Sequence, residues 1–188
     1  MNLANRLTIS RIFLAGIFIF SLFIKGVGAK FFAFAVFLIA CITDYYDGYI
    51  ARKQNAITDF GKLADPVADK ILILGAFLAF VEMKIIPAWM VMIIIARELI
   101  ITGIRILALS QKKVLSAELV GKHKTVSQMV AVISVLIFLI IRDSGFMFRY
   151  LGYYKKGVYV LMFITVVMTL ASGISYMTKN RHIFMGER

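Results

Sequence analysis

The sequence contains little cysteine, proline or acid. Its single cysteine, Cys41, cannot form a disulfide within the chain, which excludes a disulfide-stabilised scaffold. Only 2 prolines interrupt 188 residues, and 10 Asp and Glu residues stand against 22 Lys and Arg residues, for a formal net charge of +12. Charged residues of both signs make up only 17% of the chain, so the composition excludes a disordered chain and a coiled coil.

Hydrophobic residues are what the sequence has in excess. They make up 61% of the chain, whereas soluble domains contain about 45–50%. A net charge of +12 would by itself suit a nucleic-acid partner, but a chain with 16 Phe and 10 Met does not fit a soluble nucleic-acid binder. We therefore expect no nucleic-acid partner, and the class that remains is a polytopic membrane protein.

Six apolar stretches approach the length of about 20 residues that a helix needs to cross the hydrocarbon core of a bilayer. They span residues 7–24, 31–50, 66–81, 87–109, 125–141 and 157–177. Backbone polar groups in lipid must be satisfied within the chain, so these stretches predict an all-α fold. We expect six transmembrane helices in one bundle, which form a single domain over residues 1–188. The two prolines, Pro66 and Pro87, stand where a predicted helix begins and where a missing N–H costs nothing.

The topology follows from the number of spans and from the basic residues. Six spans place both termini on the same side of the membrane. Basic residues are more frequent beside the termini and in the 52–62 and 112–124 loops than in the loops of the other side. The positive-inside rule therefore predicts a multi-pass protein of the cell membrane with both termini in the cytoplasm. No clear small-residue cleavage site follows the first apolar stretch, so we expect it to be a retained helix.

Half of the scarce acidic residues lie between positions 44 and 69. Asp44 and Asp47 are three residues apart, and Asp65 and Asp69 are four apart, so each pair lies on one face of its predicted helix. A short loop joins the two helices, and we expect the pairs to face each other at the cytoplasmic side; Asp59, in that loop, is expected to be solvated. Oxygen ligands without thiols or a histidine cluster favour Mg²⁺, Mn²⁺ or Ca²⁺. Two such ions would clamp a diphosphate and stabilise displacement at phosphorus.

Small residues and a base accompany the first acidic pair. Gly48 and Ala51 share the face of Asp44 and leave a surface without bulky side chains, where a nucleotide would lie against the helix. Arg52 reaches phosphate oxygens from the same face. Gly61 stands one turn before Asp65.

The pattern Asp44-x-x-Asp47-Gly48-x-x-Ala51-Arg52 with Gly61-x-x-x-Asp65-x-x-x-Asp69 resembles the complete signature of the CDP-alcohol phosphotransferases. The resemblance implies a six-helix membrane enzyme, usually a homodimer, in which an incoming hydroxyl displaces CMP from a CDP-alcohol. It implies that the four aspartates bind Mg²⁺ or Mn²⁺, with two ions expected, and that Asp69 also serves as the general base. The residues implied to contact the CDP-alcohol are Gly48, Ala51, Arg52, Thr58 and Gly61.

The fourth predicted helix carries a polar stripe of Glu98, Thr102 and Arg105. Charges inside a membrane helix are candidates for function. The basic loop after this helix contributes Lys122 and Lys124, and these two with Arg105 would form an anion pocket for an acceptor alcohol that carries its own phosphate. The sequence leaves open whether Glu98 holds Arg105 or faces another helix. For the neighbouring Arg97, anchoring at a lipid headgroup or helix end is as good an interpretation as a functional role.

The same region resembles one branch of the family. The runs R-E-x-x-I-x-G-x-R at residues 97–105 and G-K-x-K-T at residues 121–125 recur in members that form phosphatidylglycerophosphate. This resemblance implies that CDP-diacylglycerol donates a phosphatidyl group to glycerol 3-phosphate, with release of CMP, in phospholipid biosynthesis. One alternative is the same chemistry with another acceptor, such as inositol phosphate. A second, a divalent-cation carrier, is disfavoured because the acids lie at one membrane face beside Arg52.

Overall fold

The protein is an all-helical bundle in the computed structural model, which describes residues 3–54, 59–110, 120–145 and 148–180. Side chains are described for residues 10–43, 70–108, 124–145 and 149–180. Within these ranges there is no strand, and the prediction of an all-α fold is confirmed. The helices are α1 (Leu3–Phe23), α2 (Val27–Gln54), α3 (Asp59–Glu82), α4 (Ala88–Ser110), α5 (Val120–Ser144) and α6 (Leu151–Lys179), with a 3₁₀ turn, η1 (Phe148–Tyr150), before α6.

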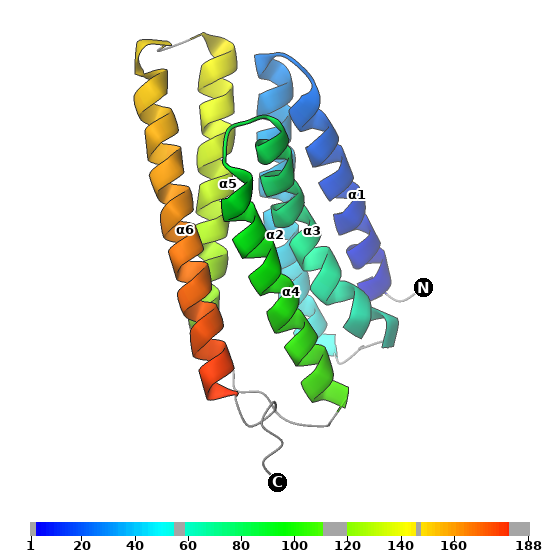
Figure 1. Cartoon of the computed structure of the whole chain (residues 1–188). Coiled ribbons are helices and arrows are strands. Elements are labelled where there is room, and N and C mark those ends of the chain that lie inside the picture. Colours follow the sequence, from blue (N-terminus) through cyan, green and yellow to red (C-terminus); the bar gives the residue numbers. More distant parts are fainter. Residues whose placement is uncertain (1–2, 55–58, 111–119, 146–147, 181–188) are drawn as a thin grey trace.

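Successive helices run in alternate directions (Figure 1). As a result, α1 begins and α6 ends at the same end of the bundle, where α2 also leads to α3 and α4 to α5. We call this the motif end, because the signature residues 44–69 belong to the end of α2 and the beginning of α3. The opposite end carries the turns from α1 to α2, from α3 to α4 and from α5 to α6.

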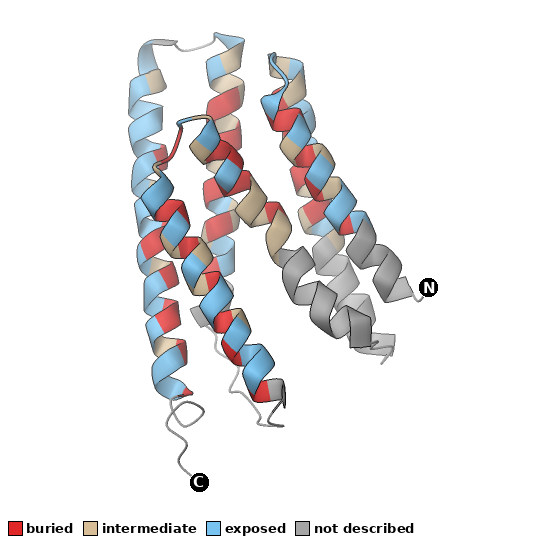
Figure 2. Ribbon diagram, turned by 45° about the vertical axis from the view of Figure 1, so that its right-hand side comes forward, coloured by how far each residue is buried: buried red, intermediate tan, exposed pale blue. Residues whose placement is uncertain are grey.

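One apolar core joins most of the bundle. Phe18 of α1, Phe37 of α2 and Phe77 of α3 are each completely buried, and Leu136 of α5 and Met162 of α6 belong to the same cluster. Figure 2 shows these buried positions as stripes along the helices, with exposed residues on their outer sides. Burial of this kind stabilises a fold by roughly 1.5–3 kcal/mol per large apolar side chain in water; in lipid, close packing takes over that role.

The outer surface of the bundle is also apolar. Phe13, Phe20 and Met92 expose 68%, 71% and 72% of their surface. Two of the described helices, α6 and the part of α5 over Lys124–Ser144, are long and apolar enough to cross a membrane, and shorter apolar helices span Ser10–Phe23 and Val27–Thr43. A broad exposed apolar surface of this kind is typical of contact with lipid or a partner. That all six helices cross the membrane stays a prediction.

The structure corrects one helix boundary. Pro87 lies directly before α4, as predicted, but the prediction that Pro66 begins a helix is wrong, because α3 begins at Asp59, seven residues earlier. The apolar run marked only the apolar part of α3, whereas helical backbone bonds continue through the polar motif residues. Pro66 therefore stands inside the helix, where it cannot donate the backbone hydrogen bond to the carbonyl of residue 62.

A buried lysine closes the α1–α2 turn at the opposite end. Lys30, 3% exposed, donates from its Nζ to the carbonyl oxygen of Leu22 at 2.5 Å and to that of Ile24 at 2.7 Å. The same Nζ lies 4.0 Å from Oδ2 of Asp143, near the end of α5. The ammonium thus donates to carbonyl oxygens at the end of α1, where carbonyls have no partner within the helix. The C-terminal end of a helix also favours positive charge because of the helix dipole.

Candidate functional site

The predicted metal-binding and nucleotide-binding residues belong to two helices that meet at the motif end. The backbone places Asp44 and Asp47 one turn apart on α2, and Asp65 and Asp69 one turn apart on α3. Their side chains, and those of Gly48, Ala51, Arg52 and Gly61, lie outside the described residues, as does the whole of Thr58. Among the described side chains, no group of three or more His, Cys, Asp or Glu residues is placed to hold a metal ion.

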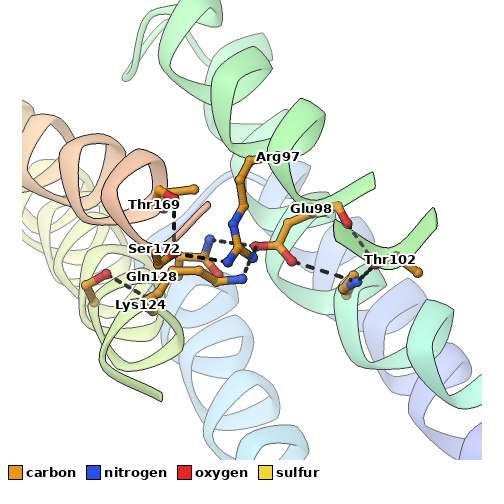
Figure 3. A network of polar contacts seen from close by, with 9 residues as sticks. Arg97, Glu98, Thr102, Lys124, Gln128, Thr169 and Ser172 are labelled. Carbon is orange, nitrogen blue, oxygen red and sulfur yellow. Dashed lines mark hydrogen bonds and ion pairs between the residues drawn. The ribbon is translucent and has the colours of Figure 1, made fainter. Parts of the chain in front are cut away.

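A charged cluster inside the bundle surrounds the carboxylate of Glu98 (Figure 3). Oε1 of Glu98 accepts a short hydrogen bond from Nζ of Lys124, lies 3.5 Å from NH1 of Arg97 and accepts from Nε2 of Gln128 at 3.4 Å. Its other oxygen, Oε2, lies 3.8 Å from Nζ of Lys70. One carboxylate therefore joins residues of α3, α4 and α5, and we refer to Lys70, Arg97, Glu98 and Lys124 as the Glu98 cluster.

Positive charge exceeds negative charge in this cluster. The side chains of Glu98, Lys124 and Arg97 are 6%, 8% and 11% exposed, and that of Lys70 is 27% exposed. Three cationic groups thus converge on the carboxylate of Glu98. Basic groups brought together in this way are suited to bind an anion.

Lys70 connects the cluster to the end of the signature motif. It follows Asp69 directly in α3, and its Nζ makes a short hydrogen bond to the hydroxyl of Thr102 on α4. The Thr102 hydroxyl donates to the carbonyl oxygen of Glu98 at 2.7 Å, so its oxygen is the acceptor toward Lys70. This contact ties α3 to α4 one residue beyond the last aspartate of the motif.

Arg97 connects the cluster to α6. Its NH2 donates to Oγ of Ser172 at 3.0 Å, and Oγ of Ser172 donates to the carbonyl oxygen of Thr169 at 3.0 Å. A glycine makes room for the arginine: a Cβ added at Gly173 would lie 3.1 Å from Cγ of Arg97. Arg97 is therefore directed into the bundle. This orientation argues against the interpretation that Arg97 anchors the chain at a lipid headgroup or helix end.

The three basic residues predicted to form the acceptor pocket have different surroundings. Lys124 is buried in the Glu98 cluster. Arg105 is exposed, with its guanidinium 5.7 Å from the ring centroid of Tyr176 on α6. Lys122 belongs to the first turn of α5, but its side chain lies outside the described residues. Glu98 therefore faces α3 and α5 rather than holding Arg105, which settles the question that the sequence left open.

Sequence reasoning missed Lys70, Gln128 and Ser172 as members of the polar site. The residues that flank each of them in its helix are mainly apolar. A polar residue inside a membrane helix itself indicates a role in function or packing. Gln128 is four residues after Lys124 on the same helix face, a spacing that was available in the sequence. Ser172 stands beside Gly173, a pair of small residues that permits a close approach of α4.

Comparison with known proteins identifies the family. The profile of the CDP-alcohol phosphatidyltransferases matches residues 1–175. A Bacillus subtilis protein named CDP-diacylglycerol–glycerol-3-phosphate 3-phosphatidyltransferase is 36% identical over 191 residues, which cover 95% of this chain and 95% of that protein. Proteins of the same name from Rickettsia bellii and Haemophilus influenzae are 33% and 32% identical, and the alignments cover 93% and 94% of this chain and 93% and 91% of those proteins. The chain belongs to the CDP-alcohol phosphatidyltransferase family, and the resemblance inferred from its motifs is confirmed.

Proposed function

We propose that this protein is a membrane enzyme of phospholipid biosynthesis that transfers the phosphatidyl group of CDP-diacylglycerol to glycerol 3-phosphate, giving phosphatidylglycerophosphate and CMP. Family membership supports the chemistry, and the names of the relatives support the acceptor. The observation that carries the choice of a phosphorylated acceptor is the buried Lys124, held by Glu98 within the same bundle as the signature motif.

The residues proposed to hold metal are Asp44, Asp47, Asp65 and Asp69. Their chemistry fits the group, because an all-carboxylate donor set without thiols suits Mg²⁺ or Mn²⁺. The two pairs occupy helix turns on either side of the α2–α3 connection, so they belong to the same end of the bundle. Two bound ions would neutralise the diphosphate of the donor and the charge that develops on it during transfer.

The reaction proposed for the chain's own residues is a single displacement. Asp69 accepts the proton of the acceptor hydroxyl while that oxygen forms a bond to the phosphorus that carries the diacylglycerol. The bond from this phosphorus to the bridging oxygen breaks, and CMP leaves. We propose that Arg52, with Gly48, Ala51, Thr58 and Gly61, binds the CDP moiety; an arginine fork matches paired phosphate oxygens. Alignment of the reactants provides most of the rate in such reactions.

The acceptor phosphate is proposed to bind to Lys124, Lys122 and Arg105. A phosphate monoester carries about two negative charges near neutral pH. Of these basic residues, Lys124 is buried beside Glu98 and so is placed inside the bundle. An acceptor without a phosphate, such as serine, has no group of matching charge for these residues to bind. Inositol phosphate would satisfy the same charge, and it remains the alternative acceptor.

The finer architecture is also part of the proposal. We propose a single domain over residues 1–188 with six membrane-spanning helices, the motif end at the cytoplasmic face and both termini in the cytoplasm. The alternation of helix directions supports this topology, because it brings the beginning of α1 and the end of α6 to the motif end (Figure 1). The family resemblance supports a homodimer, and the apolar outer surface offers room for both lipid and a second copy.

The decisive experiment supplies one candidate acceptor at a time. The purified full-length protein in detergent is given CDP-diacylglycerol, Mg²⁺ or Mn²⁺, and glycerol 3-phosphate, inositol phosphate or serine, and release of CMP is measured. We expect release with glycerol 3-phosphate and little with serine. A folded protein that releases no CMP with any acceptor would overturn the proposed enzyme, whereas preference for inositol phosphate would overturn only the choice of acceptor. Metal-dependent transport in vesicles without CMP release would favour the carrier.

The role of Asp69 has its own test. Asp69→Asn keeps the shape of the side chain and removes its basicity, so we expect kcat to fall on the order of 10²- to 10⁴-fold, the usual contribution of general acid–base catalysis. Binding of CDP-diacylglycerol, measured by calorimetry, is expected to weaken less than turnover. Asp59→Asn, outside the signature spacing, is the matched control. Full turnover by Asp69→Asn would show that this residue is not the base.

A further inference from the structure

Lys70 is the one described residue of the Glu98 cluster that adjoins the catalytic signature. It stands one position after Asp69 in the continuous helix α3. Its ammonium donates to the Thr102 hydroxyl and lies 3.8 Å from Oε2 of Glu98, and both of these residues belong to α4. The hydroxyl is itself oriented, because it donates to the carbonyl oxygen of Glu98 at 2.7 Å. The Thr102 hydroxyl, to which Lys70 is anchored, is therefore held by Lys70 and by the backbone of α4.

The contact of Lys70 with α4 restricts the rotation of α3 about its own axis. Successive residues of a helix are separated by about 100° and 1.5 Å, so a fixed Lys70 also fixes the direction in which the backbone presents position 69. The helix needs such support here, because Pro66 removes one backbone hydrogen bond from the turn that leads to Asp69. The motif end of α3 is thus held from α4 as well as by its own backbone.

We propose that Lys70 is a positioning residue for Asp69. It acts through α3: by holding this helix on Thr102 and Glu98, it sets the distance between the Asp69 carboxylate and the acceptor hydroxyl. This inference rests on the proposed function, in which Asp69 is the base. A displacement of about 1 Å at a reacting group can cost on the order of 10²-fold in rate, so loss of the anchor lowers kcat more than it lowers binding.

The first test compares three variants of the full-length protein in detergent. Lys70→Met keeps the length of the side chain and removes its charge and donors; kcat is expected to fall on the order of 10- to 100-fold, as for a misplaced base. KM for glycerol 3-phosphate stays within about twofold, because the phosphate site of the proposed function is left in place. Lys70→Arg, which keeps the charge and donors, restores most of kcat. Lys25→Met, an exposed lysine at the opposite end, is the control and leaves kcat unchanged.

The second test asks whether Lys70 acts through Thr102. Thr102→Val removes the accepting oxygen and keeps the charge of the lysine, so a smaller fall in kcat of the same kind is expected. In the double variant Lys70→Met/Thr102→Val, the second change adds nothing, because the contact is already lost. Thr102→Val also provides the measurement if Lys70→Met does not fold.

The outcomes separate this inference from the proposed function. If the wild-type protein releases CMP but Lys70→Met keeps its kcat, only the inference is overturned. A raised KM for glycerol 3-phosphate at unchanged kcat overturns it as well, because Lys70 would then belong to the phosphate site. Additive losses in the double variant overturn the route through Thr102. A wild-type protein that is folded and releases no CMP with any acceptor overturns the proposed function itself.

Discussion

Lys124 and Lys30 are both buried lysines in a hydrophobic bundle, yet their charges are balanced in different ways. Lys30, at the opposite end, is held by two carbonyl oxygens at the end of α1, with Asp143 nearby. Oδ1 of Asp143 in turn lies 3.0 Å from Nε of Arg142. Lys124, toward the motif end, is held by the carboxylate of Glu98, which two further cations share. The first site closes a turn, whereas the second brings three cationic groups together at one carboxylate.

The difference teaches how burial and function are related in this molecule. Burial alone does not mark a functional lysine, because Lys30 is 3% exposed and Lys124 is 6% exposed. The kind of partner distinguishes them. A buried cation held by carbonyl oxygens at a turn stabilises the fold, whereas a buried cation that shares a carboxylate with other basic groups is a candidate for binding an anionic ligand.

The largest effect is expected from Glu98→Gln, which keeps the shape of the side chain and removes the only carboxylate of the cluster. The buried Lys124 then loses its carboxylate partner beside two further cationic groups, and breaking a buried ion pair costs about 3–5 kcal/mol. Thermal unfolding in detergent measures this loss. The double variant Glu98→Gln/Lys124→Met is expected to recover part of it, because one uncompensated charge is removed. Glu82→Gln, which changes an exposed glutamate at the end of α3, is the control. Equal stability of Glu98→Gln and Glu82→Gln would contradict the role of Glu98 in holding these cations.

Lys124→Met should separate binding from stability. Glu98 keeps Arg97 and Lys70 as partners in this variant, so the free energy of unfolding changes little. A charge-assisted hydrogen bond to phosphate is worth about 1.5–3 kcal/mol, so KM for glycerol 3-phosphate is expected to rise by roughly tenfold or more. Steady-state kinetics at saturating CDP-diacylglycerol measures it. An unchanged KM would remove Lys124 from the acceptor site.

Lys30→Met should give the reverse result. The carbonyl oxygens of Leu22 and Ile24 lose their donor, and a buried polar group without a partner costs about 1–3 kcal/mol. The melting temperature is expected to fall, while kcat and KM of the folded protein stay as in the wild type. Lys25→Met, on the same turn but exposed, serves as the control. A change in KM for glycerol 3-phosphate would show that Lys30 also affects acceptor binding, which would contradict the distinction between Lys30 and Lys124.

Ser172→Ala should have the smallest effect. It removes the oxygen that accepts from NH2 of Arg97 at 3.0 Å and leaves the contact of Arg97 with Glu98 intact. We expect a loss of about 1 kcal/mol in the free energy of unfolding, the usual contribution of one hydrogen bond. Thr178→Ala, an exposed threonine whose hydroxyl bonds within its own helix, is the comparison. A loss as large as that of Glu98→Gln would mean that α6, rather than the carboxylate, organises the cluster.

Local periodicity predicted part of the polar site and missed the rest for a geometric reason. The stripe of Glu98, Thr102 and Arg105 was expected on one helix face, and Glu98 and Thr102 do meet at Lys70. Arg105 instead is exposed beside Tyr176. Seven residues restore the direction of a side chain but move it about 10.5 Å along the axis. A common face therefore does not imply a common site.

The sequence by itself determined the class of protein. Scarce acids, abundant hydrophobic residues and eight signature positions with fixed spacing were enough to predict an all-helical membrane enzyme of this family, because apolar length and local spacing are properties of a single helix. The tertiary structure decided which charges meet. Glu98 lies 28 residues from Lys70 and 26 from Lys124 in the chain, and their contact depends on how α3, α4 and α5 pack. Three of the basic residues behind the net charge of +12 were placed beside one carboxylate only there.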